Sequence, residues 1–175
     1  MTTYEELYIG LGSNLGNREH ALKQAVLAIH RMPSTEVLRC SPIYETEPVG
    51  YTNQPAFLNM TVAARTGMLL SPFFQRLLEV EGRLGRIRDV RWGPRVIDLD
   101  MLLVGERRME SPILTIPHPR MFERVFVLVP LLDVLRKGNH WFVLANEALD
   151  KLESKEGIAL WKKVNWLGEL ELSES

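Results

Sequence analysis

The 175-residue sequence predicts an α+β domain in which helices pack on an antiparallel sheet. Two observations support this fold class. Segments with strand and helix periodicity follow one another in the order β-α-β-β-α-β between Leu7 and Val104. In addition, 46% of the residues are hydrophobic, which suits one domain, 1–175, with a real core. Because connections between strands are short and right-handed, we expect a ferredoxin-like βαββαβ sheet with its helices on one face.

The first three elements are a strand, a helix and a strand. Leu7 to Leu11 has the pattern of a short strand. Asn17 can cap the helix that follows, and Pro33 marks its end. Four apolar positions recur at helical spacing in it: Leu22, Ala25, Val26 and Ile29. Val37 to Glu45 is predicted as one strand.

The next two elements are a strand and a helix. Phe57 to Ala64 is predicted as a strand, and the loop before it, Pro48 to Ala56, is long for a plain hairpin. Ser71 and Pro72 favour a helix start, and Gly85 marks the end of that helix. Its apolar stripe consists of Phe73, Phe74, Leu77, Leu78 and Leu84.

The last strand of the predicted sheet, Val96 to Val104, carries two aspartates on one face. Side chains alternate across a strand, so Asp98 and Asp100 share a face. The opposite face is expected to be apolar: Ile97, Leu99, Met101 and Leu103. We expect this strand to lie at the centre of the sheet.

Further elements are predicted after Gly105. We expect a small hairpin, a turn at IPHPR, a short helix over Glu123 to Leu128, and a C-terminal helix over Asn146 to Glu153. The motifs discussed below end near residue 133, so 134–175 is predicted to be a C-terminal extension of the same domain.

The composition argues against several classes of protein. A net charge of −1 and a pI near 6.4 do not favour binding to a nucleic acid or an anionic membrane. Cys40 is the single cysteine, which excludes an internal disulfide and a cysteine-built metal site. No basic segment followed by an apolar one begins the chain, so we expect no signal peptide and a cytoplasmic location.

The paired aspartates pose a chemical question, because two carboxylates side by side repel each other. One answer is a divalent cation. Alternate strand residues are roughly 6.5–7 Å apart, so both carboxylates could hold one Mg²⁺ or bridge two, with further ligands from water and phosphate. The other answer is a position at a sheet edge, or pairing with Arg91 and Arg95. The Asp-x-Asp pattern alone does not decide between them.

Arginines crowd the segment before this strand. Planar guanidinium groups bind phosphate oxygens bidentately, so carboxylates beside such a cluster indicate a polyphosphate site. We assign Arg86, Arg88 and Arg95 to that site. Arg83 lies at a helix C-terminus, where the dipole favours a cation, and we expect it to be solvated.

Glycines and histidines give weaker signals. The spacing of Gly10, Gly12 and Gly16 fits neither a dinucleotide fingerprint nor a Walker A loop, so we interpret them as tight-turn residues. His118 lies between two prolines, where its ring is held for a phosphate or a metal. The other three histidines, His20, His30 and His140, are expected to be solvated.

Phe57 and Asn59 share the strand face opposite the apolar residues of Phe57 to Ala64. An amide beside an aromatic ring can read the polar edge of a flat heterocycle while the ring stacks on it. Taken alone, the pair is better explained by a packed second layer with a satisfied asparagine.

Four stretches together resemble the 6-hydroxymethyl-7,8-dihydropterin pyrophosphokinase family of the folate pathway. They are IGLGSNLGN, SPIYETEPVGYTNQPAFLNM, GRIRDVRWGPRVIDLDMLLVG and IPHPRMFERVFVLVPL, and the match covers roughly residues 7–133. The resemblance implies that diphosphate passes from ATP to the hydroxymethyl group of the dihydropterin, with release of AMP. It also implies a monomer with these two small-molecule substrates and no nucleic-acid or membrane partner.

The resemblance also implies roles for individual residues. Asp98 and Asp100 would bind two Mg²⁺ ions around the triphosphate. The residues implied for ATP are Glu81, Arg86, Arg88, Arg95, Met101, Leu114, Thr115, His118 and Arg124. Those implied for the pterin are Thr46, Val49, Gly50, Phe57, Asn59, Trp92, Asp98 and Phe126. Arg86, Arg95, Asp98 and Asp100 would form the catalytic centre.

This chain departs from the family pattern at two places. Asp89 and Val90 stand where some members carry a lysine, and Pro119 stands where some carry an aromatic residue.

The main alternative is a two-metal nucleotidyl transferase or another Mg-nucleotide phosphotransferase on a similar scaffold. Such an enzyme would be expected to show a third carboxylate and a basic track. An RNA-binding sheet is the non-enzymatic alternative, but its aromatic and basic signature is missing.

Overall fold

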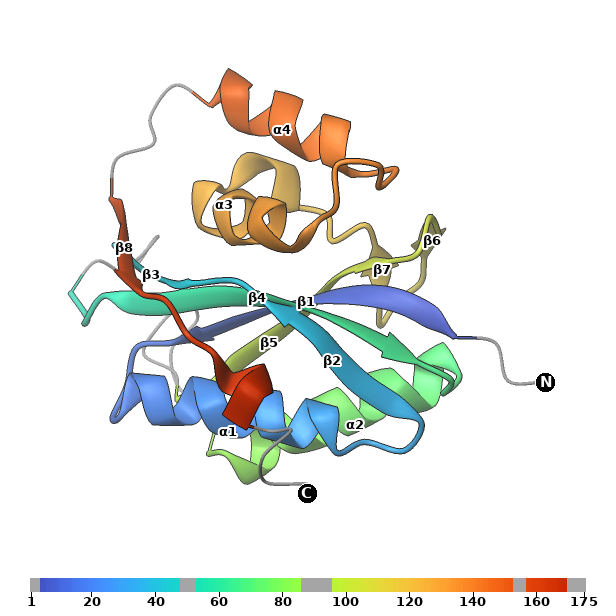
Figure 1. The fold of residues 1–175 in the computed structure, drawn as a ribbon, viewed down its shortest axis with the longest axis horizontal. Coiled ribbons are helices and arrows are strands. Elements are labelled where there is room, and N and C mark those ends of the chain that lie inside the picture. Colours follow the sequence, from blue (N-terminus) through green and yellow to red (C-terminus); the bar gives the residue numbers. More distant parts are fainter. Residues whose placement is uncertain (1–3, 48–52, 86–95, 153–156, 170–175) are drawn as a thin grey trace.

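A computed structural model of the chain describes residues 4–47, 53–85, 96–152 and 157–169 (Figure 1). Its elements in chain order are β1 (Glu5–Ser13), α1 (Arg18–His30), β2 (Thr35–Cys40), β3 (Ile43–Thr46), β4 (Phe57–Thr66), α2 (Leu70–Arg83), β5 (Asp98–Val104), β6 (Met109–Glu110), β7 (Thr115–Ile116), the 3-10 helix η1 (Met121–Glu123), α3 (Val125–Val134), α4 (Phe142–Lys151) and β8 (Ile158–Lys162). Residues 166–169 are also helical.

The main sheet has the strand order β5-β1-β4-β3-β8, and β2 also pairs with β4. Its pairs are antiparallel. The last strand of the predicted motif thus lies beside the first, and the first beside the third, as expected for the ferredoxin-like order. The prediction that the aspartate strand is central is wrong: among the described strands β5 pairs with β1 alone, so it forms an edge. β5 follows α2 in the chain and pairs with β1 on the side away from β4.

The predicted strand from Val37 to Glu45 is two strands, β2 and β3. Pro42 has no backbone N–H to give to the sheet. Beside it, the Ser41 hydroxyl accepts the Thr61 N–H at 2.9 Å, and the Ser41 N–H donates to the Thr61 carbonyl at 2.9 Å. The serine side chain therefore replaces a ladder hydrogen bond at the point where the strand is interrupted.

The two helices of the predicted motif pack on one face of the sheet, as expected, and the later helices cover part of the other face. In Figure 1, α1 and α2 pack below the sheet, and α3 and α4 lie above it. The lower core contains the four apolar residues predicted for the first helix, all buried, and the Asn17 side chain caps that helix as expected. The upper core contains side chains of the two later helices and a fully buried Trp141.

A β-bulge reverses the expected face of Leu103. Met101 pairs with Ile9 while Leu103 pairs with the adjacent Tyr8, so β5 carries one extra residue, Leu102, at this point. Leu99 and Met101 pack in the lower core as predicted, but Leu102 and Leu103 both pack in the upper core.

The C-terminal part contains more helix and strand residues than predicted. The hairpin after Gly105 is present as β6 and β7. The expected helix over Glu123 to Leu128 is η1 followed by α3, which continues through Pro130. The last predicted helix begins earlier, as α4, and β8 was not predicted. No helix within the described ranges has the length and apolar character needed to cross a membrane.

Candidate active site

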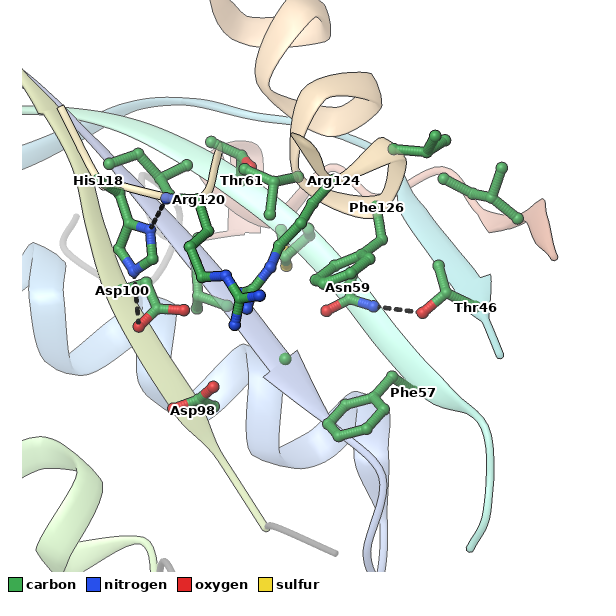
Figure 2. Close-up of a pocket in the computed structure, with 18 of the residues that line it drawn as sticks. Thr46, Phe57, Asn59, Thr61, Asp98, Asp100, His118, Arg120, Arg124 and Phe126 are labelled. Atoms are coloured by element: carbon green, nitrogen blue, oxygen red, sulfur yellow. Dashed lines mark hydrogen bonds and ion pairs between the residues drawn. The ribbon is translucent and has the colours of Figure 1, made fainter. Parts of the chain in front are cut away.

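A pocket of about 760 Å³ lies on the upper face of the sheet, beside the N-terminal end of α3 (Figure 2). Its floor is formed by strands β1, β4 and β5. Its lining residues are Gly10, Leu11, Gly12, Thr46, Glu47, Phe57, Asn59, Met60, Thr61, Asp98, Asp100, Leu102, His118, Arg120, Glu123, Arg124, Val125, Phe126, Val127, Gly157 and Ile158. Because α3 and α4 cover only part of this face, the remainder of the floor is open to a ligand.

An acidic corner is formed by Asp98, Asp100 and His118. The two aspartates lie on one face of β5, as their spacing predicted (Figure 2). The His118 Nε2 atom is 4.0 Å from an Asp100 carboxylate oxygen. Burial lowers the pKa of His118, the charges of Arg124 and Arg120 lower it further, and Asp98 opposes them. The described residues contain no group of three or more His, Cys, Asp or Glu side chains that could hold a metal by themselves.

Two arginines occupy the middle of the pocket. Arg120 follows the Pro-His-Pro turn and Arg124 precedes α3, and Figure 2 shows both side chains pointing into the space between the aspartates and Phe126. The Arg124 guanidinium also lies 5.6 Å from the centre of the Phe126 ring. The pocket therefore places negative and positive groups in adjacent zones.

An aromatic and amide corner lies on the other side of the arginines. Phe57 and Asn59 face the pocket from β4, and Phe126 faces them from α3 (Figure 2). The Asn59 Nδ2 atom donates to the Thr46 hydroxyl at 2.6 Å. This bond fixes the amide and directs its remaining groups toward the pocket.

Gly10 and Gly12 are strand residues of β1 that line this floor, so their interpretation as turn residues is wrong. A Cβ atom on Gly12 would lie 2.8 Å from the Asn59 Oδ1 atom. Because Gly12 has no side chain, the Asn59 amide can occupy this space. Gly16, with a φ of +71°, is in a turn as predicted.

Glu81 reaches the aspartate strand from the lower face of the sheet. It lies in α2 and is 3% exposed, and its Oε1 atom accepts the Leu99 N–H at 2.7 Å. The bonded amide belongs to the residue between the two aspartates. Glu81 is not among the pocket-lining residues.

The predicted site residues fall into three groups. Eight line the pocket: Thr46, Phe57, Asn59, Asp98, Asp100, His118, Arg124 and Phe126. Four are described but do not line it: Glu81, Met101, Leu114 and Thr115. Six lie outside the described residues: Val49, Gly50, Arg86, Arg88, Trp92 and Arg95. Arg91 also lies outside them, and Arg83 is exposed as expected.

Several pocket residues were missed by the sequence prediction. Thr61 follows Phe57 and Asn59 in the alternation of β4, so period two would have found it. Arg120 belongs to the IPHPR turn, but the local sequence of that turn does not indicate that its side chain lines the pocket. Ile158 enters from β8, for which the chain carries no clear local signal. His30 was expected to be solvated, but its Nδ1 atom accepts the Val37 N–H at 3.1 Å.

Comparisons with known proteins identify what the chain is similar to. A model of the 7,8-dihydro-6-hydroxymethylpterin-pyrophosphokinase family matches residues 8–136. The chain is 42% identical to the 2-amino-4-hydroxy-6-hydroxymethyldihydropteridine pyrophosphokinase of Bacillus subtilis, over 96% of this chain and 97% of that protein. It is 40% identical to the protein of the same name in Pseudomonas aeruginosa, over 74% of this chain and 80% of that one.

A solved structure shares the fold. The HPPK-DHPS protein of Plasmodium falciparum, crystallised with pterin and p-hydroxybenzoate, superposes with a TM-score of 0.62 at 15% identity. The superposition covers 85% of this chain and 42% of the Plasmodium chain. At this identity the likeness supports the α+β fold alone.

Proposed function

This chain belongs to the 7,8-dihydro-6-hydroxymethylpterin-pyrophosphokinase family, and from that premise we propose that its upper-face pocket binds ATP and the dihydropterin side by side. The protein is a diphosphate-transferring enzyme of folate biosynthesis. In the proposed reaction the hydroxymethyl oxygen attacks the β-phosphorus of ATP and loses its proton to solvent, the bond from the β-phosphorus to the oxygen that bridges to the α-phosphorus breaks, and AMP leaves.

One observation carries this proposal. A single pocket contains paired carboxylates, two guanidinium groups and an aromatic and amide corner, in that order across its floor. A magnesium polyphosphate requires the first two zones, and a flat, polar heterocycle requires the third. The order also places the phosphate zone beside the heterocycle zone, which direct transfer between the two substrates requires.

Asp98 and Asp100 are the residues proposed to hold Mg²⁺. Two oxygen donors on one strand face suit a cation that completes its octahedron with water and phosphate oxygens. The half-exposed Asp100 side chain, 41% accessible, leaves room for such ligands. When bound, the metal would neutralise phosphate charge and orient the phosphates. The absence of a third acidic ligand among the described residues fits a site that substrate completes.

His118, beside Asp100, and Arg124, at the start of α3, are proposed to contact the phosphates. The lowered pKa of His118 keeps its ring neutral near pH 7 in the free protein, so it can donate one hydrogen bond without adding charge. Arg86, Arg88 and Arg95 remain predicted phosphate contacts. Met101 and Leu114 remain predicted backbone contacts to adenine, Thr115 to the ribose, and Glu81 to the nucleotide.

Phe57 and Phe126 are proposed to stack on the two faces of the pterin. Asn59 would then meet the polar edge of the ring. Because one Nδ2 hydrogen is donated to Thr46, the Oδ1 atom remains to accept a ligand N–H and the second Nδ2 hydrogen remains to donate. Val49, Gly50 and Trp92 remain predicted pterin contacts.

Transfer to an alcohol at phosphorus depends on in-line positioning and charge neutralisation, which this set of side chains can supply without a covalent nucleophile. The test is a product assay with purified protein, Mg²⁺, ATP and 6-hydroxymethyl-7,8-dihydropterin, in which the nucleotides are separated afterwards. We expect AMP, formed only when the pterin is present. Formation of ADP would contradict diphosphate transfer, and absence of turnover with tight Mg-ATP binding would contradict the pterin half of the proposal.

A further inference from the structure

We infer that Arg120 binds the phosphate chain of the nucleotide and makes the pocket prefer ATP to AMP. The inference deepens the proposed function and rests on it. Arg120 was not among the residues predicted from the sequence, and it enters through its position in the pocket.

The backbone of Arg120 is held between two anchored residues. The His118 N–H donates to the Leu102 carbonyl at 2.9 Å, which fixes the turn to β5. Met121, on the other side, is fully buried in the upper core, and its N–H donates to the His118 carbonyl at 3.2 Å. The Arg120 N–H is in addition 3.4 Å from the His118 Nδ1 atom. The exposed side chain therefore starts from a fixed point at the rim of the pocket.

The Arg120 side chain points into the pocket that Arg124 also lines (Figure 2). Both charges lower the pKa of His118, which agrees with their position beside the acidic corner. Within the described part of the chain, neither guanidinium forms an ion pair with a carboxylate. Glu123 also lines the pocket, but its hydrogen bond with Arg120 joins only their backbones.

Two like charges directed into one space repel each other, and an anion between them removes that repulsion. A polyphosphate provides several oxygens for two planar guanidinium groups, whereas a monophosphate provides one phosphate group. Arg120 lines the same pocket as the two aspartates, and its charge acts on His118, whose Nε2 atom is 4.0 Å from Asp100. It is therefore placed to meet the phosphates that the proposed magnesium would bind. The loss of Arg120 should therefore weaken ATP more than AMP.

The experiment compares Arg120→Gln, Arg120→Lys and the control Arg76→Gln. Arg76 is exposed on α2, on the other side of the sheet, and its substitution changes the net charge by the same amount. Binding of a nonhydrolysable ATP analogue with Mg²⁺, and of AMP, is measured by calorimetry. We expect Arg120→Gln to weaken the analogue roughly tenfold, as for a charge-assisted hydrogen bond, and AMP by less than about twofold. Arg120→Lys should restore part of the loss, and the control should change neither.

Unchanged analogue binding in Arg120→Gln would overturn the inference, and so would an equal loss for the analogue and AMP. Equal losses in Arg120→Gln and Arg76→Gln would show a general charge effect instead. Thermal unfolding of each variant separates these results from misfolding. AMP formation by the unaltered protein tests the proposed function separately, so the two can fail independently.

Discussion

The two faces of the sheet differ in how completely they are covered. The lower face is closed by α1 and α2 over a continuous apolar core. The upper face is covered only in part by α3 and α4, and the rest is the pocket (Figure 1). Since strand residues alternate between faces, neighbours such as Asp98 and Leu99 belong to opposite environments. Substitutions in the lower core should mainly change stability, and substitutions in the upper-face pocket should mainly change activity.

The largest effect is expected for Asp100→Asn. We expect turnover to fall roughly 100- to 1,000-fold, because the variant loses a carboxylate proposed to hold the metal. The free energy of unfolding without Mg²⁺ should stay the same or rise, since one of two repelling charges is gone. Steady-state kinetics and urea unfolding measure both. Turnover like that of the unaltered protein would contradict the metal role.

Two phenylalanines, one on each side of the sheet, allow the two faces to be compared with the same residue type. Phe73 is fully buried in the lower core, so Phe73→Ala should lower the free energy of unfolding by about 3–5 kcal/mol. Phe126→Ala should instead weaken pterin binding by roughly 10- to 100-fold, as for the loss of a stacked ring, with a smaller effect on stability. Calorimetry and denaturation of both variants provide the test. A Phe126→Ala protein that binds pterin normally would contradict the stacking proposal.

Glu81 connects the two faces. It lies in α2 below the sheet, and it accepts a hydrogen bond from β5, the strand that carries the two aspartates of the pocket. Glu81→Ala leaves the Leu99 N–H without its acceptor, so we expect a loss of roughly 1–3 kcal/mol in unfolding free energy and several-fold slower turnover. Glu81→Gln keeps an acceptor oxygen and should retain more of both. A variant with weaker ATP binding and unchanged stability would contradict this structural role and would support the predicted contact of Glu81 with the nucleotide.

Two glycines give the smallest expected effects. Gly12→Ala brings a Cβ atom against the Asn59 Oδ1 atom and should weaken pterin binding several-fold. Gly82 lies in α2, and an added Cβ atom there would meet no heavy atom within 4 Å beyond its own helical turn. Gly82→Ala should therefore raise the free energy of unfolding by about 0.5–1 kcal/mol. Pterin titration and thermal denaturation check the two changes. Equal pterin affinity in both variants would show that the space at Gly12 is not required.

Much of the fold could be predicted because its signals are local. The alternation of β4 and the Asn17 cap each depend on a few neighbouring residues, and both agree with the structure. The edge position of β5, the bulge at Leu102 and the pairing of β8 depend on distant partners. No periodicity within a segment contains that information.

The residues of the candidate site also divide into those that a local pattern predicts and those that depend on distant partners. The face shared by Asp98 and Asp100, and that shared by Phe57 and Asn59, follow from strand alternation, so these pairs were predicted correctly. Gly12 and Arg120 enter the pocket only because β1, β4 and the Pro-His-Pro turn come together. Such contacts require the tertiary structure. The assignment of ATP and pterin to the two corners rests on the family and on the chemistry of the pocket.

The most direct test of the difference between the two faces uses the neighbours Asp98 and Leu99. The Asp98→Asn and Leu99→Ala proteins would each be measured for unfolding free energy and for turnover per folded molecule. We predict that Asp98→Asn unfolds like the unaltered protein and loses most turnover. Leu99→Ala should lose about 2–5 kcal/mol of stability and keep most of its turnover per folded molecule. The account would be contradicted if Asp98→Asn retained full turnover, or if Leu99→Ala, while folded, were as inactive as Asp98→Asn.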